Sequence, residues 1–390
     1  MRSHWLLEEG VVFLNHGSFG ACPRLVLEAQ ARLRERMERE PVRFFVRELE
    51  PLIAEAREQV ARFVGAAPER LLFVRNATSA VNAVVGSLEL SPGDELLTTD
   101  HEYNACRNVL EHAARQAGAR VVTAKIPFPV SGPDEVVAAI LAVATDRTRL
   151  ALVDHVTSPT GLVLPIERIV AALADRGVDT LVDGAHGPGM LPLDLETLGA
   201  AFYTGNFHKW VCAPKGAGML WVRADRADGI HPAVISHGYN SERPRSMLLE
   251  EFDWTGTDDP TPWLCVPDAI RFVGGLVPGG WPEVRARNHA LVLEGRRILC
   301  EALGQIPAAP EEMIGSLASV CLPDGSGAPP RSALAVDPLQ DALYDRHRIE
   351  VPIVPWPSSP GRLVRISAQL YNGTDDYRAL AAALLAELGC

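Results

Sequence analysis

The sequence predicts an α/β protein with a mainly parallel seven-stranded sheet in a large domain and a smaller α+β domain toward the C-terminus. Between about residues 50 and 225, short apolar runs rich in β-branched residues alternate with longer segments of helical periodicity, which is the pattern of βαβ crossover units. The chain has 390 residues, of which 47% are hydrophobic and 22% charged, so it is long enough for two hydrophobic cores.

Seven segments are predicted as strands because each is a short apolar run followed by polar or turn-forming residues. They cover residues 71–76, 95–100, 120–126, 149–156, 180–185, 201–206 and 216–222. Helices are predicted between the first five strands, at 79–88, 104–118, 134–144 and 165–177. Pro165 is suited to opening the last of these helices, because its missing N–H is not needed there.

The C-terminal part of the chain has a different composition. Residues 225–280 are rich in Pro, Gly, Trp and Asp, which predicts a long loop. A helix is expected at 282–303, a strand at 362–369 and a final helix at 375–388. We therefore expect a large domain formed by residues 20–280 and a small domain formed by 1–19 and 281–390.

Charge and cysteine content exclude several classes of partner. A formal net charge of -12 argues against nucleic acid and anionic membranes, which attract basic surfaces. Two early glutamates interrupt any signal-peptide core, and no stretch reaches about 18 uncharged apolar residues. The seven cysteines are scattered without a C-x-x-C pair, as is typical of a reducing compartment. We expect a cytoplasmic protein that binds a small molecule.

Polar residues follow the predicted strands at their carboxyl ends, where open parallel sheets bind ligands. These segments are Asn76 to Thr78, Asp100 to Tyr103, Asp154 to Thr157, Asp183 to His186, and Asn206 to Lys209. Four of the eleven histidines lie on this predicted rim. Such a concentration indicates a functional site, and a divalent metal site stays open as an alternative at this point.

Lysine is scarce in this chain, and its placement is informative. Only three of the 37 basic residues are lysines, and two of them, Lys209 and Lys215, lie in GNFHKWVCAPKG (205–216). Arginine stays protonated and cannot form a Schiff base, whereas lysine can. The segment therefore suggests a covalent amine, with two ordinary surface charges as the alternative.

Eight motifs, taken in order along the chain, resemble the class V aminotransferase family of pyridoxal-phosphate (PLP) enzymes of fold type I. Within that family the likeness is to the isopenicillin N epimerase-like and cysteine desulfurase-like branch. The motifs are LNHGSFG (14–20), NATSAVN (76–82), HEYNA (101–105), DHVTSPTG (154–161), DGAHGPG (183–189), HKWVCAPKG (208–216), WTGTDD (254–259) and VRISAQLYN (364–372). They span nearly the whole chain.

The resemblance implies that Lys209, Asp183 and His101 are the catalytic residues. Lys209 would hold PLP covalently, release it to an incoming amino acid and then move the α-proton. Asp183 ends an apolar strand, where a carboxylate needs a partner, and the ring nitrogen of PLP would provide one. The alternative for Asp183 is a helix cap in a loop. His101 would stack on the ring, with the nearby Tyr103 as the other aromatic candidate.

Other positions are implied to surround the cofactor. The phosphate would be held at the start of a helix, where backbone amides are free, and by side chains that follow a later strand. His186, where desulfurases often carry glutamine, and Thr157 would contact the phenolic oxygen. Thr257 would come from the neighbouring subunit of a homodimer. The complete implied cofactor set is Ala77, Thr78, His101, Thr157, Asp183, His186, Asn206, His208, Lys209 and Thr257.

Arg365 is implied to bind the substrate α-carboxylate, because its fork of donors suits a carboxylate. The alternative is one surface arginine among many. Tyr103, Asn15 and His16 are expected to line the same cleft. No residue is assigned as a metal ligand.

The lack of a cysteine at one position limits the reactions that the resemblance implies. Desulfurases carry a reactive cysteine before the carboxylate-binding arginine, but residues 347–361 contain none. The overall resemblance implies an isopenicillin N epimerase-like enzyme acting at the α-carbon of a small amino acid. The alternative is a C–S lyase that resembles hercynylcysteine sulfoxide lyase or cysteine desulfurase. A PLP-free metal-binding protein on the same fold is a third. Tyr103, His16 and His155 are the open candidates for the second acid that epimerisation needs.

Overall fold

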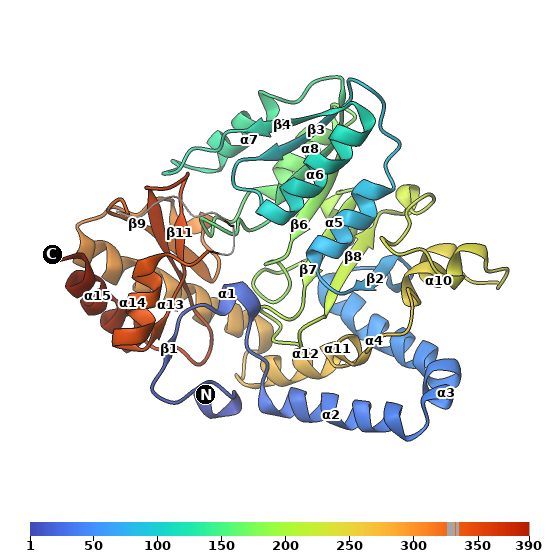
Figure 1. The fold of residues 1–390 in the computed structure, drawn as a ribbon, viewed down its shortest axis with the longest axis horizontal. Helices are drawn as coiled ribbons and strands as arrows, with labels where there is room; N and C mark the ends of the chain where they lie inside the picture. The colour runs from blue at the N-terminus through green and yellow to red at the C-terminus, as the bar shows by residue number, and fades with distance from the viewer. Residues whose placement is uncertain (326–331, 333–334, 390) are drawn as a thin grey trace.

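A seven-stranded sheet forms the centre of the computed structural model, which describes residues 1–325, 332 and 335–389 (Figure 1). The strand order is β2-β8-β7-β6-β5-β3-β4. The strands are β2 (Leu71–Val74), β3 (Glu95–Thr99), β4 (Arg120–Ala124), β5 (Thr148–Asp154), β6 (Asp179–Gly184), β7 (Phe202–Asn206) and β8 (Gly218–Val222). All seven predicted strands are confirmed, with ends that differ by at most two residues.

The sheet is parallel except for β8, which is antiparallel to both of its neighbours. Residues 207–217 join β7 to β8 without a helix. Because a parallel neighbour requires a longer crossover connection, this short link turns the chain back on itself. The link carries Lys209, so the topology places the amine at the carboxyl end of β7.

Helices cover both faces of the sheet, which explains why its strands are apolar throughout. One face packs against α5 (Ala77–Gly86) and α6 (Asn104–Ala117). The other packs against α4 (Leu49–Val64) and α8 (Ile166–Ala174). The four predicted crossover helices are confirmed; the remaining one is α7 (Pro133–Leu141).

The elements before residue 71 were not predicted from the sequence. The structure has β1 (Val12–Phe13), α1 (His16–Phe19), α2 (Arg24–Arg39), α3 (Pro41–Arg43), a π-helical stretch at Phe44–Glu48, and α4 there. Short helical turns lie at Arg2–His4, Pro68–Arg70, α9 (Leu195–Leu198), Ala224–Arg226, His237–Asn240 and Glu311–Met313.

The prediction of one long loop over residues 225–280 was wrong. This segment contains α10 (Met247–Asp253), α11 (Thr261–Leu264) and α12 (Val266–Gly275). Pro262 and Pro267 each occupy the first turn of a helix, where a missing N–H costs nothing. Their presence lowered the apparent helical character of the segment although they mark where two helices begin.

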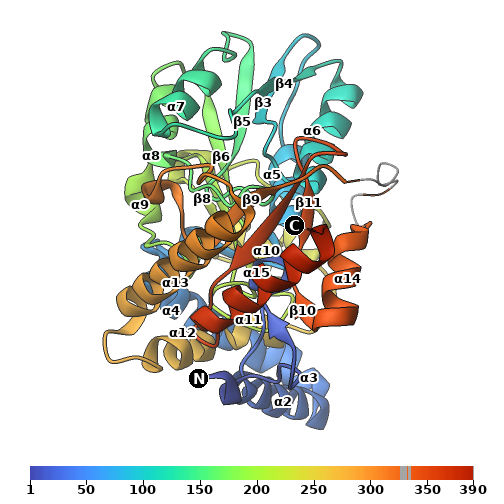
Figure 2. The same cartoon turned by 90° about the vertical axis from the view of Figure 1, so that its left-hand side faces the viewer.

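A second sheet with the order β11-β12-β9 lies in the C-terminal part, and α13 and α15 pack near it (Figure 2). The elements are α13 (Gly280–Leu303), β9 (Leu317–Leu322), α14 (Pro338–His347), β10 (Ile349–Glu350), β11 (Ile353–Pro355), β12 (Arg362–Ser367) and α15 (Thr374–Leu388). The α/β fold class is therefore confirmed, including its smaller α+β part. The exact domain boundaries at 19/20 and 280/281 stay a prediction.

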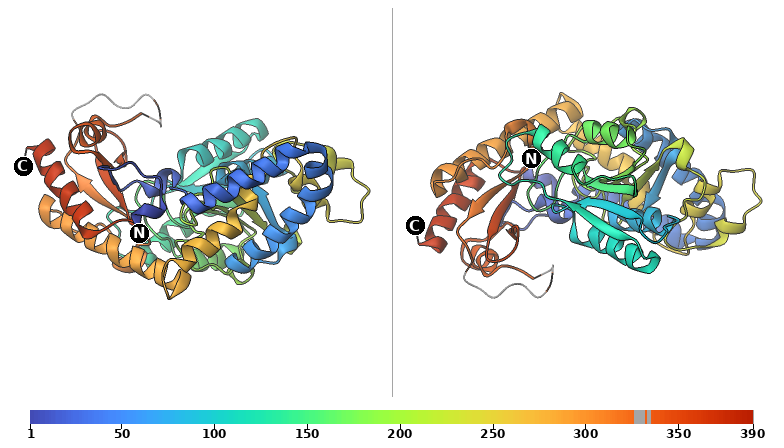
Figure 3. Two further views of the ribbon diagram at one scale, coloured as in Figure 1. Left: turned by 90° about the horizontal axis from the view of Figure 1, so that it is seen from below. Right: turned by 90° about the horizontal axis from the view of Figure 1, so that it is seen from above.

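The N-terminal segment runs beside the C-terminal elements, where β1 pairs in parallel with β10 (Figure 3). This pairing brings α1 toward the carboxyl ends of the large sheet. Among the described residues, we find no helix with both the length and the apolar content that crossing a bilayer requires.

Candidate active site

A cavity of about 370 Å³ lies at the carboxyl ends of β5, β6 and β7, beside the start of α5. Asp154, Asp183 and Asn206 project from the three strand ends. Nine residues expected at the site line this cavity: Ala77, Thr78, Tyr103, Asp183, His186, Asn206, His208, Lys209 and Arg365. The cavity therefore lies at the strand ends, where open parallel sheets bind ligands.

Lys209, in the β7–β8 link, has hydrogen-bond partners at both its backbone and its side chain. The ring nitrogen Nε2 of His16 hydrogen-bonds to the carbonyl oxygen of Lys209 at 3.0 Å, and the Lys209 Nζ lies 3.1 Å from Nε2 of His186. Burial lowers the pKa of the Lys209 amine to about 8, and the attraction of Asp183 only partly opposes that effect. A substantial neutral fraction near pH 7–8 makes this amine a usable nucleophile.

Lys215, the other lysine of the segment, has a different environment. Its side chain is exposed, and its Nζ donates to the carbonyl oxygen of Gly20 at 2.9 Å. It does not line the cavity that contains Lys209.

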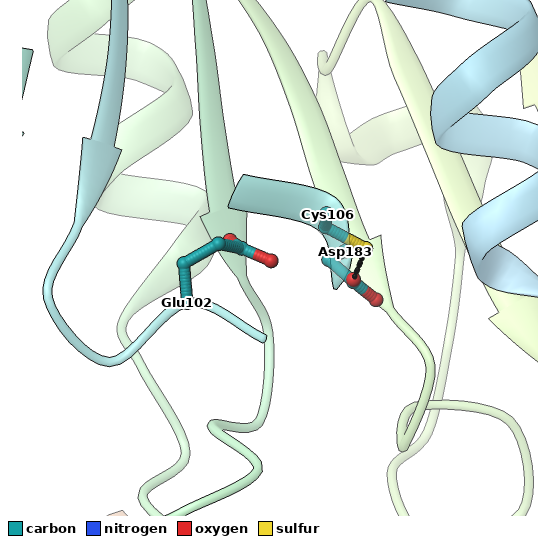
Figure 4. A group of neighbouring side chains, drawn as sticks. All are labelled: Glu102, Cys106 and Asp183. Carbon is teal, nitrogen blue, oxygen red and sulfur yellow. Dashed lines mark hydrogen bonds between the residues drawn. The ribbon is translucent and has the colours of Figure 1, made fainter. Parts of the chain in front are cut away.

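Asp183 is buried and anchored by two donors (Figure 4). Its Oδ1 accepts the N–H of Ala185 at 2.9 Å, and its Oδ2 accepts the thiol of Cys106 at 3.3 Å. No lysine or arginine lies within ion-pair distance of its carboxylate among the described residues. A buried acid with this environment can receive a cationic ring nitrogen, which is the pairing that PLP would provide.

Two further acids lie beside Asp183, and sequence reasoning assigned neither a role. One ligand-type atom each from Glu102, Cys106 and Asp183 lies within 4.8 Å of the others (Figure 4). Asp154 is the parallel register partner of Asp183 and lines the cavity. Its strand-end position was the signal that could have identified it.

Glu102 and Asp154 are buried acids that lie close to Asp183. Burial, followed by the charge of neighbouring carboxylates, raises the pKa of both groups well above their ordinary values. Oε2 of Glu102 and Oδ2 of Asp154 are buried without a donor in the described part of the chain. A proton held between the two acids would satisfy both oxygens.

The start of α5 forms an anion-binding end of the cavity. In its first turn, Ala77 N–H donates to Asn206 Oδ1, and Ser79 N–H donates to Asn76 Oδ1, each at 2.9 Å. Asn76 also accepts the Ala80 N–H through its carbonyl. This leaves the N–H of Thr78 for a ligand, at the positive end of the helix dipole.

His208 lies at the same end of the cavity. Its Nδ1 lies 3.2 Å from the Ala217 carbonyl oxygen, so Nδ1 must carry the proton of a neutral ring. Burial, with a smaller contribution from Lys209, lowers the pKa of His208 to about 4. A phosphate dianion bound beside it would favour the doubly protonated ring, which can donate from Nε2 as well.

Arg365 reaches the cavity from β12 as a buried cation without a carboxylate partner among the described residues. Its Nη1 donates to the carbonyl oxygen and the hydroxyl of Ser158, at 2.6 and 3.2 Å, and its Nη2 donates to the Ser18 hydroxyl at 3.0 Å. Its Nε has no partner. An unpaired buried guanidinium that faces a cavity is suited to binding an anionic ligand.

The preference for His101 over Tyr103 as the stacking residue needs correction. His101 is fully buried outside the cavity, where its ring nitrogens lie 2.8 Å from the Thr160 hydroxyl and 3.1 Å from the Ile126 carbonyl oxygen. Tyr103 lines the cavity and is 46% exposed. The turn after β3 therefore points the tyrosine, not the histidine, at the site.

Four other expected site residues do not line the cavity either. Thr157 is fully buried and hydrogen-bonds to the Thr160 hydroxyl at 2.7 Å. Thr257 is exposed. The amide of Asn15 donates to Glu350, and His16 lies beneath Lys209 with its Nδ1 2.7 Å from the Tyr371 hydroxyl. Seven lining residues were outside the predicted site set: Gly17, Ser18, Phe19, Asn76, Asp154, Ser158 and Ala185.

Comparison with known proteins decides the family. Residues 23–255 match the model of the family described as aminotransferase class-V. This chain belongs to the aminotransferase class-V family. Members of the family depend on PLP, and the charges and donors of the cavity fit that cofactor: a buried amine, a buried acid without a counter-ion and a helix start with a free N–H.

Curated relatives cover nearly the whole class-V chain. It is 39% identical to an isopenicillin N epimerase of Amycolatopsis lactamdurans, over 98% of this chain and 96% of the relative. It is 37% identical to an isopenicillin N epimerase of Streptomyces clavuligerus, over 100% and 98%. A probable chloroplastic L-cysteine desulfhydrase of Arabidopsis thaliana is 33% identical, over 95% and 82%.

Solved structures show the same fold. The cystine C–S lyase C-DES superposes with a TM-score of 0.80 at 22% identity, over 96% of this chain and 97% of that one. The cysteine desulfurase CsdA from Escherichia coli gives 0.76 at 20% identity, over 100% and 97%. At these identities the likeness supports the fold, and the chemistry must come from the site itself.

Proposed function

We propose that this class-V enzyme is an amino-acid epimerase similar to isopenicillin N epimerase, acting at the α-carbon of a small amino-acid substrate. One observation carries the proposal: the amine of Lys209, the acid of Asp183 and the unpaired guanidinium of Arg365 line a single cavity. The two epimerase relatives, similar over nearly the full length, support the reaction type.

The residues for PLP follow from the geometry. Lys209 would hold the cofactor covalently, and Asp183 would pair with its ring nitrogen. Thr78, Asn206 and His208, at the start of α5 and the end of β7, would hold the phosphate. When bound, PLP supplies an electron sink that stabilises negative charge at the substrate α-carbon.

The remaining steps belong to this chain's own side chains. Arg365 would bind and orient the substrate α-carboxylate. Lys209 would remove or return the α-proton on its own side. Of the three candidates for the second acid, only Tyr103 lines the cavity. His155 is buried with its Nδ1 2.9 Å from the Tyr203 hydroxyl, and His16 contacts the backbone of Lys209. Burial raises the pKa of Tyr103, so its hydroxyl carries a proton at neutral pH.

We also propose a cytoplasmic homodimer in which Thr257 of one subunit completes the phosphate site of the other. The exposure of Thr257, outside the cavity of its own chain, supports this arrangement. Measuring the molecular mass in solution tests the dimer, and the activity of mixed dimers made from T257A and K209A subunits tests the shared site. Activity of the mixed dimers in excess of that of either parent variant would support sharing, and a fully active monomer would contradict it.

Deuterium exchange tests the reaction. The purified enzyme, loaded with PLP, is incubated with L-amino acids in deuterated water, and the α-carbon is analysed by mass and chirality. We expect deuterium at the α-carbon and appearance of the D-enantiomer, both absent in K209A. Release of keto acid and ammonia in place of racemised amino acid would contradict an epimerase.

A C–S lyase is the second candidate, supported by the desulfhydrase relative. L-Cysteine with detection of sulfide and pyruvate distinguishes it. Transfer of sulfur to an enzyme thiol is disfavoured. Cys212 follows Lys209 by three residues and Cys106 donates to Asp183, and burial raises the pKa of both thiols. The metal-binding alternative is disfavoured by the family assignment. Bound zinc in a purified protein that shows no borohydride-sensitive near-visible band would support the metal-binding alternative.

A further inference from the structure

Trp210 and His186 form a buried contact directly behind the Lys209 amine. The indole Nε1 of Trp210 donates to Nδ1 of His186 at 3.2 Å. The other ring nitrogen of His186, Nε2, lies 3.1 Å from Lys209 Nζ. Both residues are almost fully buried, with 1% and 2% exposure, and the contact between them is shielded from solvent.

The chemistry of these groups determines where the imidazole proton lies. An indole N–H only donates, so Nδ1 of His186 must present a lone pair. Burial, reinforced by the positive charges of Lys209 and Arg365, holds the pKa of His186 well below its ordinary value, so the ring is neutral. The one remaining proton is therefore on Nε2, and Nε2–H donates toward the neutral amine of Lys209.

We propose that Trp210 is a positioning residue that fixes His186 as the Nε2–H tautomer, making His186 a permanent hydrogen-bond donor into the cofactor pocket. The function of this donor rests on the proposed PLP chemistry: it would contact the phenolic oxygen of PLP and favour the anionic form of that oxygen. The tautomer itself does not depend on a cofactor. Because Trp210 follows Lys209 directly, one segment supplies both the amine and the orientation of its partner.

The groups that face His186 leave few other ways to set its tautomer. Lys209, Arg365, His208 and His16 are the charged or titratable groups that act on it, and all are cations or neutral bases. None of them is an acid that would draw a proton onto Nδ1. Removing the indole donor therefore frees Nδ1 and allows the two tautomers to mix.

Nitrogen NMR of the apoprotein labelled with ¹⁵N-histidine tests this directly. In the parent protein, Nδ1 of His186 is expected to lack a proton and Nε2 to carry one at about pH 9, where the Lys209 amine, with a pKa of about 8, is mostly neutral. In W210F the two nitrogens should shift toward each other as the tautomers mix. W263F is the matched control, because the Trp263 indole donates to the Val74 carbonyl oxygen away from the pocket.

A second readout uses the PLP-loaded enzyme. A hydrogen bond to a charged oxygen is worth about 1.5–3 kcal/mol, so its weakening in W210F should raise the pH midpoint of the near-visible band by about one pH unit. In an H186Q background, W210F should cause no further shift, because the tryptophan acts through His186.

The possible outcomes are distinct. A proton on Nδ1 of His186 in the parent apoprotein would overturn the proposal even if W210F does not fold. An unchanged tautomer and an unchanged midpoint in W210F would also overturn it. If the tautomer is as expected but no near-visible band forms with PLP, the proposed function fails and the tautomer assignment stands.

Discussion

Replacing Arg365 with methionine should show whether this residue serves substrate binding or the stability of the fold. The side chain is 5% exposed and has no carboxylate partner within the described part of the chain, so its charge is held there at a cost to folding. Methionine keeps much of the length and removes the charge. We expect R365M to fold normally and to lose most of its activity.

The magnitudes follow from the environment of the guanidinium. Burial lowers the pKa of Arg365 to about 10, from an ordinary value above 12, which corresponds to about 3 kcal/mol against the ionised form. Its three hydrogen bonds to Ser158 and Ser18 contribute about 1 kcal/mol each. The two terms nearly cancel, so the free energy of unfolding of R365M should lie within about 2 kcal/mol of the parent. Loss of a buried charge pair with the substrate costs about 3–4 kcal/mol, or two to three orders of magnitude in kcat/KM.

Urea unfolding of the apoprotein and kcat/KM for the epimerised amino acid measure the two effects, and PLP affinity should be unchanged. R57M is the matched control, because Arg57 is equally buried but pairs with Asp253. Its loss should cost about 3 kcal/mol of stability. If R365M is as unstable as R57M and retains its kcat/KM, Arg365 is a structural residue and the substrate assignment is wrong.

Three further predictions follow from the pocket. Because the Lys209 amine has a pKa of about 8 and reacts when neutral, the rate at which PLP becomes borohydride-reducible should rise with pH through about 8; a rate already maximal at pH 6 would contradict this. Glu102 has a raised pKa, so the native state binds more protons than the unfolded state and the protein loses stability as pH rises above about 4. E102Q should therefore raise the apoprotein Tm at pH 7.5 and not at pH 4. An equal change in Tm at both pH values would contradict the raised pKa. N76A removes the N-cap of α5 and should cost about 1 kcal/mol in urea unfolding while weakening PLP binding measured by fluorescence; unchanged PLP affinity would argue against a phosphate site there.

The α/β fold could be predicted because its strands are buried on both faces. A strand of that kind is a continuous apolar run bounded by polar residues, and the signal is local. The helices at 261–264 and 266–275 were not predicted, because Pro262 and Pro267 look like helix breakers unless their place in the first turn is known. Only neighbouring structure shows where a turn begins.

The site was predictable only in part. Strand-end residues such as Asp183 and Asn206 converge in any parallel sheet, and Lys209 has a chemistry that arginine cannot replace. The choice between His101 and Tyr103 was not predictable, because the two residues are close in sequence and only the geometry of the turn before α6 decides which one reaches the cavity.

The sequence by itself determined the order of strands along the chain, the pocket edge and the lysine, because each depends on residue type and local pattern. The tertiary structure alone decided that Arg365 is buried at the cavity without a carboxylate partner among the described residues, and which acids share the interior with Asp183. Charge, burial and proton position are properties of what surrounds a side chain. Those surroundings come from segments as distant in sequence as α1, the loop after β5, and β12, and they exist only once the chain has folded.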